Sequence, residues 1–556
     1  MRQTPSDDYD ESSVVPSALY AGGDNLLFGR PMLETLRSSH PQPVQMFMLW
    51  QTFLDNVNPL VKLFHAPTVQ QSILEASSNL ENVAASTEAL MFAIYLCAVT
   101  SLRNDDCERI IGASRQALLA RFSNAAQQAL INTEILKTSN LVVLQAFTLF
   151  LLAMREHYDH DTIWLLAGLA IRIGQRIGLH REGASREVSV FEAEMRRRLW
   201  WQIRILDFRS AQLSGSKIEP DYMHFETKRP LNVNDSDLSP SMKEPPLEHA
   251  GVTDMLFCSI RYEIGEFMRQ KRALKIFDGV GLRGNARVSV AEKDKAIDEF
   301  EEMLEQKYLR YTDQSIPLHY ISTGLAKGIV CKMRLLAHHP RQYQDKGASL
   351  PQAEKDMLFS TSLKMVEFDN LNSTTGSIRR YLWHMKVYLQ LDAFIYLLGE
   401  LRNRTDGDEV DRAWHQVGLV FKNHPEMITN TKNSLYFAMG NLALKAWEKR
   451  LAAAGRNHGL YQVATPDFIT HLRSQRKAAP AQPMKSVAGV KTNEFPDPDF
   501  HTIQPNYDDT FPGLGMADEF DPTFLATYAE MDASPMDWEY WQGLMEGSEW
   551  PMMNDN

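Results

Sequence analysis

The chain has 556 residues, of which 44% are hydrophobic and 23% are charged. These are ordinary values for a soluble globular protein, and the length allows several domains. The four cysteines, at positions 97, 107, 258 and 331, are scattered without short paired spacings. This pattern excludes a disulfide framework and predicts reduced, mostly buried thiols of an intracellular protein.

Neither a signal peptide nor a membrane span is predicted. The first thirty residues lack the apolar core of a signal peptide. The most apolar run, Leu141 to Met154, is interrupted by Gln145 and Thr148. It is too short to cross roughly 30 Å of hydrocarbon, so we expect a buried helix there and no contact with a membrane.

The net charge of −12 is concentrated at one end of the chain. No Lys or Arg follows Lys491, whereas fifteen Asp and Glu lie between positions 492 and 556. Without the fifteen acids of this tail, the formal charge of −12 becomes about +3, so the rest of the chain is nearly neutral. A nearly neutral body argues against a broad electrostatic footprint for nucleic acid.

The first 39 residues are polar and acidic, with Gly, Ser and Pro, and we predict that they are mostly disordered. From His40 onward the chain becomes dense in apolar and aromatic residues, and this marks the start of a helical body. The stretch from Thr87 to Leu102 is apolar nearly all round, which predicts a buried helix. Further helical patterns follow at 106–133 and 136–155.

The next stretch, from Asp161 to Gly215, predicts two helices and the joint between them. Asp161 is a candidate N-cap, because its carboxylate can accept amide hydrogens of the first turn. One face of the first helix then carries small and apolar residues spaced three and four apart, namely Trp164, Ala167, Gly168, Ile171 and Gly174. We expect Trp164 to be buried and Gly168 to lie against another helix. Gly178 stands where a left-handed C-cap would end this helix, and Leu179 can pack back on its last turn.

The second helix of this stretch begins near Phe191. Glu192 and Arg196 are four residues apart, as are Glu194 and Arg198, with the acid first, which is the better orientation for a pair on a helix. A buried stripe of apolar residues is expected along this helix. It consists of Met195, Leu199, Ile203 and Leu206, and it is flanked by Trp200 and Trp201.

The residue identities in this stretch add a resemblance to a family. Over more than fifty residues they follow one another in a specific order: Trp164, Gly168, Arg172, Gly178, Leu179, His180 and Arg181, then Glu194, Arg196, Arg197, Arg198, Trp200, Trp201, Asp207, Ser214 and Gly215. This order closely resembles the fungal-specific transcription factor domain, the helical regulatory region of fungal zinc-cluster regulators. The opening from Pro41 and the segment from Pro230 to Leu238 also look like this family. The resemblance implies an all-α regulatory domain at 40–451, best matched over 41–240.

The rest of the chain fits the same organisation. After Gly215 a stretch rich in Pro, Asn, Asp and Ser predicts a long ordered loop across the helical body. Helical patterns resume from about His249 to Leu451, and we find neither alternating strand patterns nor fixed-period repeats. Residues 452–491, rich in Ala, Pro and basic residues, are predicted to be a linker.

The tail at 492–556 combines acids with large apolar side chains. Its anchors are Trp538, Tyr540, Trp541, Leu544, Met545 and Trp550. Acidic-hydrophobic segments of this kind are a recognised class of disordered activation domain, and they can fold as short helices in a partner's groove. We therefore predict an activation segment that binds the transcription machinery or a coactivator. The alternative is a tail that packs back on the helical body.

The chemistry expected of a full zinc-cluster regulator is missing from this sequence. Such a regulator carries six N-terminal cysteines that hold two zinc ions, and zinc requires ligands that converge tetrahedrally. No cysteine precedes Cys97, so we expect no cofactor and place direct sequence-specific DNA binding in doubt. Arg196, Arg197 and Arg198 are interpreted as internal ion pairs that join the two halves of the domain, rather than as phosphate ligands.

Four interpretations therefore stay open. The first, which we favour, is a nuclear fungal regulator with an activation tail, and for it the resemblance suggests control of a secondary-metabolite gene cluster. A second is a coregulator or corepressor that works through a DNA-bound partner protein, or as a homodimer. A third is a chain that lacks the start of the natural protein. The last is an all-α enzyme such as a terpene cyclase, but the near-motifs at Asp105–Arg109 and Asn234–Leu238 each lack a required oxygen ligand for Mg²⁺. We therefore predict no catalytic residues and no metal site.

Overall fold

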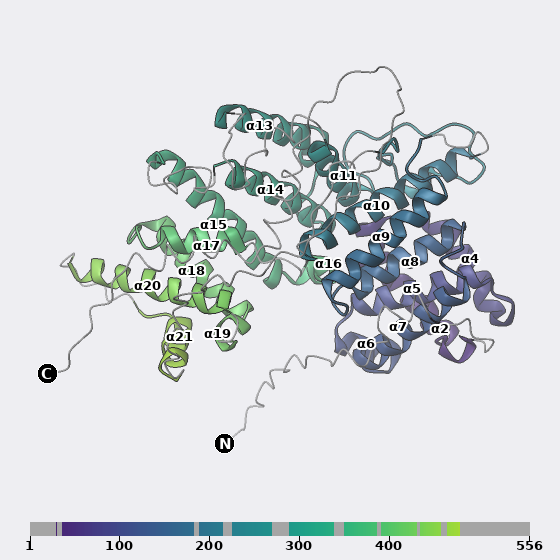
Figure 1. The fold of residues 1–556 in the computed structure, drawn as a ribbon, viewed down its shortest axis with the longest axis horizontal. Helices are drawn as coiled ribbons and strands as arrows, with labels where there is room; N and C mark the ends of the chain where they lie inside the picture. Colours follow the sequence, from purple (N-terminus) through teal and green to yellow (C-terminus); the bar gives the residue numbers. More distant parts are fainter. Residues whose placement is uncertain are drawn as a thin grey trace, which may run out of the picture.

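A computed structural model gives the fold of the chain (Figure 1). It describes residue 29 and residues 36–182, 188–214, 225–269, 289–338, 350–385, 391–430, 434–456 and 464–478. These residues form α-helices and short 3₁₀ helices and contain no strand, which confirms the all-α prediction. The acidic tail at 492–556 and residues 1–28 lie outside the described residues.

The first half of the body is a helical layer built around α5 (Ala85–Thr100). From position 89 to its end every residue of α5 is buried, because the helix is enclosed by α2, α7 and α8 and is apolar on all sides. The other elements of this half are η2 (Leu36–Ser39), α2 (Pro43–Asn56), α3 (Asn58–Val61), α4 (Ala66–Ser78), η3 (Leu80–Asn82), α6 (Asn104–Ile111), α7 (Arg115–Asn132), α8 (Leu141–Met154), α9 (His160–Arg176) and α10 (Val190–Ser214).

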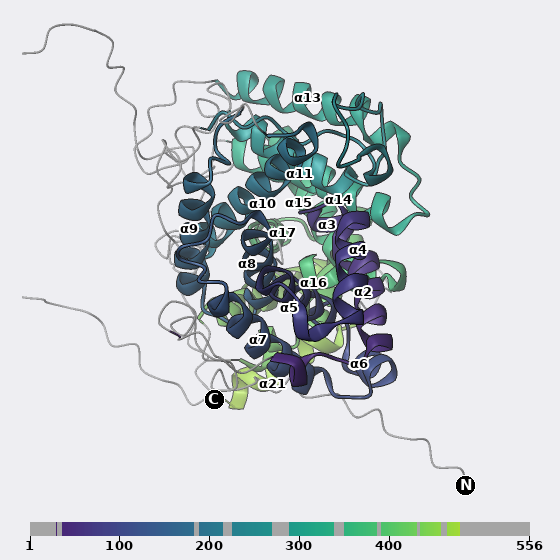
Figure 2. The same ribbon diagram turned by 90° about the vertical axis from the view of Figure 1, so that its right-hand side faces the viewer.

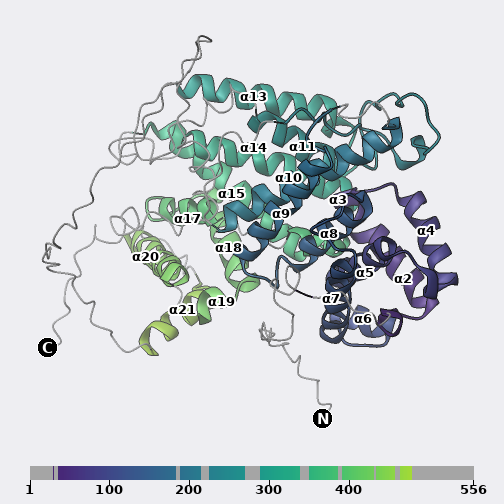
Figure 3. The same cartoon turned by 45° about the vertical axis from the view of Figure 1, so that its right-hand side comes forward.

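The second half continues from α10 and carries two further cores. One core lies among α10, α11, α13 and α14, and the other among α15, α17, α18, α20 and α21 (Figures 2 and 3). The elements are η5 (Asp235–Asp237), α11 (Leu256–Arg269), α13 (Val290–Lys307), η6 (Leu309–Tyr311), α14 (Pro317–Ala337), α15 (Gln352–Thr374), η8 (Gly376–Tyr381), α16 (Leu382–Met385), α17 (Leu391–Glu400), α18 (Asp408–Asn423), α19 (Glu426–Thr429), α20 (Ser434–Arg456) and α21 (Asp467–Ala478).

Hydrogen bonds from side chains to backbone carbonyls join the second half to the first. The indole of Trp383 donates to the carbonyl of Asn56 at 3.0 Å, and Arg155 donates to the carbonyl of Trp383 at 2.8 Å. From α11, Arg261 donates to the carbonyl of Leu60 at 3.2 Å. These bonds satisfy backbone carbonyls at the ends of short helices, where helical partners are lacking. They therefore hold the two halves together as one body.

The boundaries of the helical body differ from the sequence-based expectation at its C-terminal end. Within the stretch 452–491, predicted to be a linker, α20 extends to Arg456 and α21 adds another helix. Phe468, Ile469 and Leu472 of α21 are buried in the core of the second half, so this helix belongs to the packed body. In the segment 1–39, predicted to be mostly disordered, residues 36–39 form η2.

The four cysteines all lie in the described part of the chain and are free thiols. Cys97, Cys107 and Cys258 are buried and Cys331 is half-buried, as the scattered spacing predicts. Within the described ranges, no helix combines the length and the apolar character needed to cross a membrane.

Candidate functional site

The helix that opens the central motif, α9, begins two residues earlier than the sequence suggests. Its N-cap is Asp159, whose carboxylate accepts from the backbone amide of Thr162 at 2.8 Å. The expectation that Asp161 fills this position is wrong, because Asp161 lies in the first turn, where its charge faces the positive end of the helix. His160, directly after this cap, is the first helical residue.

The joint after α9 has the geometry that the sequence predicts. Gly178 adopts a left-handed backbone conformation with φ of 79°, which glycine tolerates without strain. Its amide bonds the carbonyl of Gln175, and the amide of Leu179 bonds the carbonyl of Gly174 at 2.9 Å. This pair of bonds is the Schellman arrangement, and it directs the buried Leu179 back onto the helix.

The close approach between α9 and α10 occurs at Gly174. A methyl group added there would lie 3.0 Å from the ring of Trp200, a fully buried side chain of α10. Two expectations are therefore corrected. Gly168 has open space where a side chain would project, and Trp164 is only half-buried. The face of α9 turned to the core is centred on positions 163, 167, 170 and 174.

The arginine run on α10 makes internal ion pairs, as predicted. Arg196 pairs with Glu192 at 2.7 Å, one turn earlier on the same helix. Arg197 pairs with Glu182 from the loop after α9, and more distantly with Glu194 at 3.6 Å. Glu182 also accepts from a backbone amide of the loop that follows α10, so this arginine joins α10 to segments on both sides of it.

Arg198 is completely buried and lies between two carboxylates. It pairs with Glu194 at 3.2 Å and with Asp235 at 2.8 Å. Asp235 lies in η5 and pairs on its other oxygen with Lys62 at 3.0 Å. Lys62 also pairs with Asp254 at 3.4 Å. We call Lys62, Glu194, Arg198, Asp235 and Asp254 the Asp235 cluster.

The Asp235 cluster joins three segments that are distant in the sequence: the end of α3, the middle of α10 and the loop around η5. Burial opposes ionisation of Asp235, but the nearby Lys62 ammonium and the Arg198 guanidinium outweigh it and lower the pKa of this carboxyl to about 2. For Glu194 the balance differs, because burial raises the pKa of this carboxyl despite the two neighbouring arginines. A group with a lowered pKa stabilises the fold above its unfolded value near pH 4, and this stability is lost as the pH falls toward 2.

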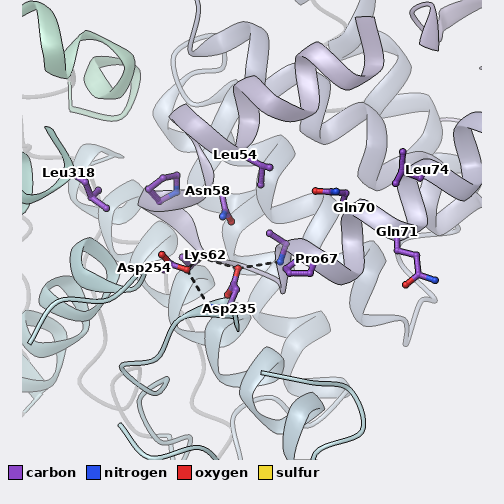
Figure 4. A pocket seen from close by; sticks show the side chains of 12 residues that line it. Leu54, Asn58, Lys62, Pro67, Gln70, Gln71, Leu74, Asp235, Asp254 and Leu318 are labelled. Atoms are coloured by element: carbon purple, nitrogen blue, oxygen red, sulfur yellow. Dashed lines mark hydrogen bonds and ion pairs between the residues drawn. The ribbon is translucent and has the colours of Figure 1, made fainter. Parts of the chain in front are cut away.

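A groove of about 620 Å³ opens directly above part of this cluster (Figure 4). Its charged lining residues are Lys62, Asp235 and Asp254. The remaining lining residues come from α2, α3, α4 and α14, and they are Leu54, Asn58, Pro59, Ala66, Pro67, Gln70, Gln71, Leu74 and Leu318. The groove is therefore lined by apolar side chains together with the amides of Asn58, Gln70 and Gln71, and its charged residues belong to the Asp235 cluster.

Asp207, another predicted motif residue, occupies a different environment on α10. It is 1% exposed, and its Oδ2 has no hydrogen-bond partner among the described residues. Burial raises the pKa of this carboxyl to about 7, although the Arg204 guanidinium works in the opposite direction. Arg204 itself lies over the rings of Trp200 and Phe225, at 5.9 and 5.6 Å.

The pKa of Asp207 predicts an unusual dependence of stability on pH. Because the folded pKa lies above the unfolded value near 4, the free energy of unfolding should fall as the pH rises from about 4 to 7. The variant Asp207→Asn cannot ionise, so we expect it to be more stable than the parent at pH 8, by on the order of 4 kcal/mol. Its advantage should shrink as the pH is lowered to 5. Urea denaturation of both proteins at pH 5 and pH 8 checks this. A stability difference between variant and parent that is smaller at pH 8 than at pH 5 would contradict the prediction.

The remaining predicted residues are peripheral to these contacts. Arg172 is exposed and hydrogen-bonds Gln175 at 3.3 Å. His180 lies 6.1 Å from the ring of Trp200, and burial lowers the pKa of its imidazole. Ser214 ends α10 and donates to the carbonyl of Ala211. Gly215 and the six tail anchors lie outside the described residues.

The acidic residues of the two terpene-cyclase near-motifs make ion pairs or helix caps in the structure. Asp106 pairs with Arg103 and Arg109 on the surface of α6. Asn234 and Asp237 cap η5 reciprocally, and Asp237 also pairs with His249 at 2.8 Å. In the described part of the chain, no group of three or more His, Cys, Asp or Glu residues could hold a metal ion.

Asp235 and Lys62 are central to the cluster, but neither was predicted from the sequence to be a site residue. A signal for Asp235 was available, because it falls in the segment from Pro230 to Leu238 that resembles the family. Lys62 gives no such signal in the sequence. Its backbone has φ of 38° and ψ of 54°, a left-handed conformation that is uncommon for a residue with a side chain and is seen only in the structure.

The body is all-α, and its buried ion pairs join α10 to α3 and to the loop around η5. The model of the fungal-specific transcription factor domain matches residues 50–252, which contain the joint, the arginine run and the loop around η5. The chain belongs to this family, because the match is accompanied by relatives that are similar over most of its length.

Three relatives illustrate this similarity. The chain is 38% identical to the aurofusarin cluster transcription factor aurR2 of Gibberella zeae, over 94% of this chain and 79% of that protein. It is 34% identical to the transcriptional regulator AacuB of Aspergillus aculeatus, over 77% of this chain and 58% of that protein. It is 32% identical to the pyriculol/pyriculariol biosynthesis cluster transcription factor 1 of Pyricularia oryzae, over 84% and 64% respectively. The chain thus covers less than two thirds of the length of the second and third of these relatives.

Proposed function

We propose that this protein is a nuclear regulator that activates the genes of a secondary-metabolite biosynthetic cluster. The observation that carries the proposal is the 38% identity to a cluster transcription factor over nearly the whole chain. The printed names of two of the relatives described above refer to a biosynthetic cluster, which supports the same assignment. The names of these relatives describe transcription factors or transcriptional regulators, which supports a regulatory role over an enzymatic one for this chain.

The helical body serves as the regulatory domain, and the acidic tail serves as the activating segment. The tail has fifteen acids and no Lys or Arg, so its charge keeps the aromatic anchors solvated until a partner buries them. Its partner is a coactivator or another component of the transcription machinery. We expect the tail to contribute little to the stability of the body.

The runner-up is a coregulator that reaches DNA through a partner protein. The sequence observation that favours it is the nearly neutral charge of the body, which argues against a broad electrostatic footprint for nucleic acid. In both hypotheses the tail binds the transcription machinery or a coactivator. The two hypotheses differ in whether this protein binds DNA itself or reaches it through a partner protein.

The proposed role of the tail is tested by transferring it to a foreign DNA-binding domain. Residues 492–556 fused in this way should activate a reporter gene. Replacing Trp538, Trp541 and Leu544 together by Ala should abolish activation, because buried aromatic and aliphatic anchors supply most of the binding energy in such grooves. The single change Asp537→Asn should reduce activation slightly, since the acids mainly steer the encounter.

Two outcomes would contradict this role of the tail. One is an inert fusion. The other is a large fall in the melting temperature of the body after deletion of residues 492–556, which would indicate a tail that packs back on the domain.

A further inference from the structure

The side of α9 that faces away from the core carries a regular row of residues. The core face of this helix is centred on positions 163, 167, 170 and 174, and successive residues of an α-helix lie about 100° apart around its axis. Asp161, Leu165, Gly168 and Arg172 therefore lie on the opposite side of the helix, and we call them the outer row of α9. In Figure 2, α9 lies at the left edge of the coloured ribbon, and it packs against α8 and α10 on its inner side.

The outer row has the spacing of a helix face that pairs with another helix. Its members are four, three and four residues apart, which is the alternation of the seam positions in a coiled coil. Leu165 is 66% exposed, and a Cβ added at Gly168 would have no atom of its surroundings within 4 Å. Two half-buried apolar residues, Trp164 and Leu169, flank the row. A second helix that lies along this row would remove the Leu165 side chain from water, which is favourable.

The charges on the surface of α9 are opposite at its two ends. The N-terminal end carries Asp159 and Asp161, the C-terminal end carries Arg172 and Arg176, and all four residues are exposed. Arg172 hydrogen-bonds Gln175 on its own helix at 3.3 Å. Two such helices in parallel would bring like charges together, whereas two antiparallel helices bring each acidic end beside a basic end. The face is therefore complementary to itself in the antiparallel orientation, which a two-fold axis perpendicular to the helix imposes.

We propose that the outer row of α9 binds the same row of a second copy of this chain, antiparallel and related by a two-fold axis. With the axis between positions 166 and 167, Asp161 of each copy lies opposite Arg172 of the other. In the same register, Leu165 of each copy lies opposite Gly168 of the other, where no side chain occupies the space. The paired segment is about 16 Å long, which is a small interface, so we expect a dissociation constant on the order of 10 µM.

Sedimentation velocity of the full chain tests this self-association at concentrations from about 1 to 100 µM. The parent protein should change from monomer to dimer over this range. Leu165→Asp places a charge in the apolar part of the interface, so its dissociation constant should be at least about tenfold higher. The control is Leu247→Asp, at a leucine of the loop after η5 that is 92% exposed, and it should dimerise like the parent.

Two charge reversals test the antiparallel register. Arg172→Asp and Asp161→Lys each place like charges opposite one another in a homodimer, so each variant alone should self-associate at least about tenfold more weakly than the parent. Mixed in equal amounts, the two variants should form a heterodimer about as tight as the parent dimer, because every acid then faces a base again. Arg310→Asp, at an exposed arginine of η6, is the control and should not affect dimerisation. At about 1 µM, where the chain is monomeric, all these variants should melt nearly as the parent does, since the substituted side chains are exposed.

Three results would overturn the proposal. The first is a parent protein that stays monomeric up to about 100 µM. The second is a dimer of Leu165→Asp as tight as that of the parent, since the copies would then meet through another surface. The third is a mixture of Arg172→Asp and Asp161→Lys that associates no more tightly than either variant alone, which would exclude the antiparallel pairing of the two rows.

Discussion

Replacing Arg198 by Met should lower the free energy of unfolding of the body by about 3–5 kcal/mol. The side chain is completely buried, and the change would leave the carboxylates of Glu194 and Asp235 without their shared cation. Removing one member of a buried ion pair is costly because the remaining charge cannot be solvated by water. Met preserves the length and apolar volume of the side chain, so the loss would report the charge rather than a cavity.

Arg196→Met is the matched control, two positions away on the same helix. Arg196 pairs with Glu192, whose side chain is 43% exposed, and such a pair contributes about 0–1 kcal/mol. Thermal and urea denaturation of the two variants should therefore differ strongly. Equal losses for both variants would mean that the Asp235 cluster contributes no more than a surface ion pair.

The second large effect concerns the contact between α9 and α10. Gly174→Leu should destabilise the body by about 1–3 kcal/mol or more, because the new side chain must displace the fully buried ring of Trp200. At Gly168, an added Cβ has no atom of its surroundings within 4 Å. There the higher helix propensity of Leu should leave stability unchanged or raise it by about 0.5–1 kcal/mol.

Melting temperatures of the two glycine variants check this difference. A variant Gly168→Leu that loses as much stability as Gly174→Leu would show that both glycines are close-packed, and would contradict the placement of α9 against α10.

The contrast between Gly168 and Gly174 shows what helical periodicity can and cannot predict. Both glycines belong to the same pattern of residues three and four apart, and the pattern correctly predicted a helix with a small-residue face. A helix has 3.6 residues per turn, so positions 168 and 174 lie roughly 120° apart around its axis. Only one of these two glycines can therefore face the neighbouring helix directly. The size of Trp200 opposite Gly174, which only the packing reveals, settles the question.

The ion pairs also fall into those that the sequence could predict and those that it could not. Pairs within one helix, such as Arg196 with Glu192, follow from a spacing of four residues and were predicted. The pair between Arg198 and Asp235 spans 37 positions, and that between Lys62 and Asp235 spans 173. Such contacts depend on how the loop around η5 crosses the helical body. The sequence predicted the loop and its family likeness, but could not assign its partners.

Helix α21 lies in a stretch whose amino-acid composition led to the prediction of a linker. The Ala, Pro and basic residues around it are typical of a linker, and they dominate the stretch 452–491. Only Phe468, Ile469 and Leu472 reveal a buried face, and three apolar residues over five positions are too few to distinguish a packed helix from chance.

The most direct test of the central claim is the transcript level of the genes adjacent to the locus that encodes this protein. Transcripts are measured in the parent fungus, in a deletion strain and in a strain that overproduces the protein. Activation of a biosynthetic cluster predicts that a contiguous set of neighbouring biosynthetic genes rises together on overproduction and falls together on deletion. Unchanged transcripts of these genes in both strains would contradict the account.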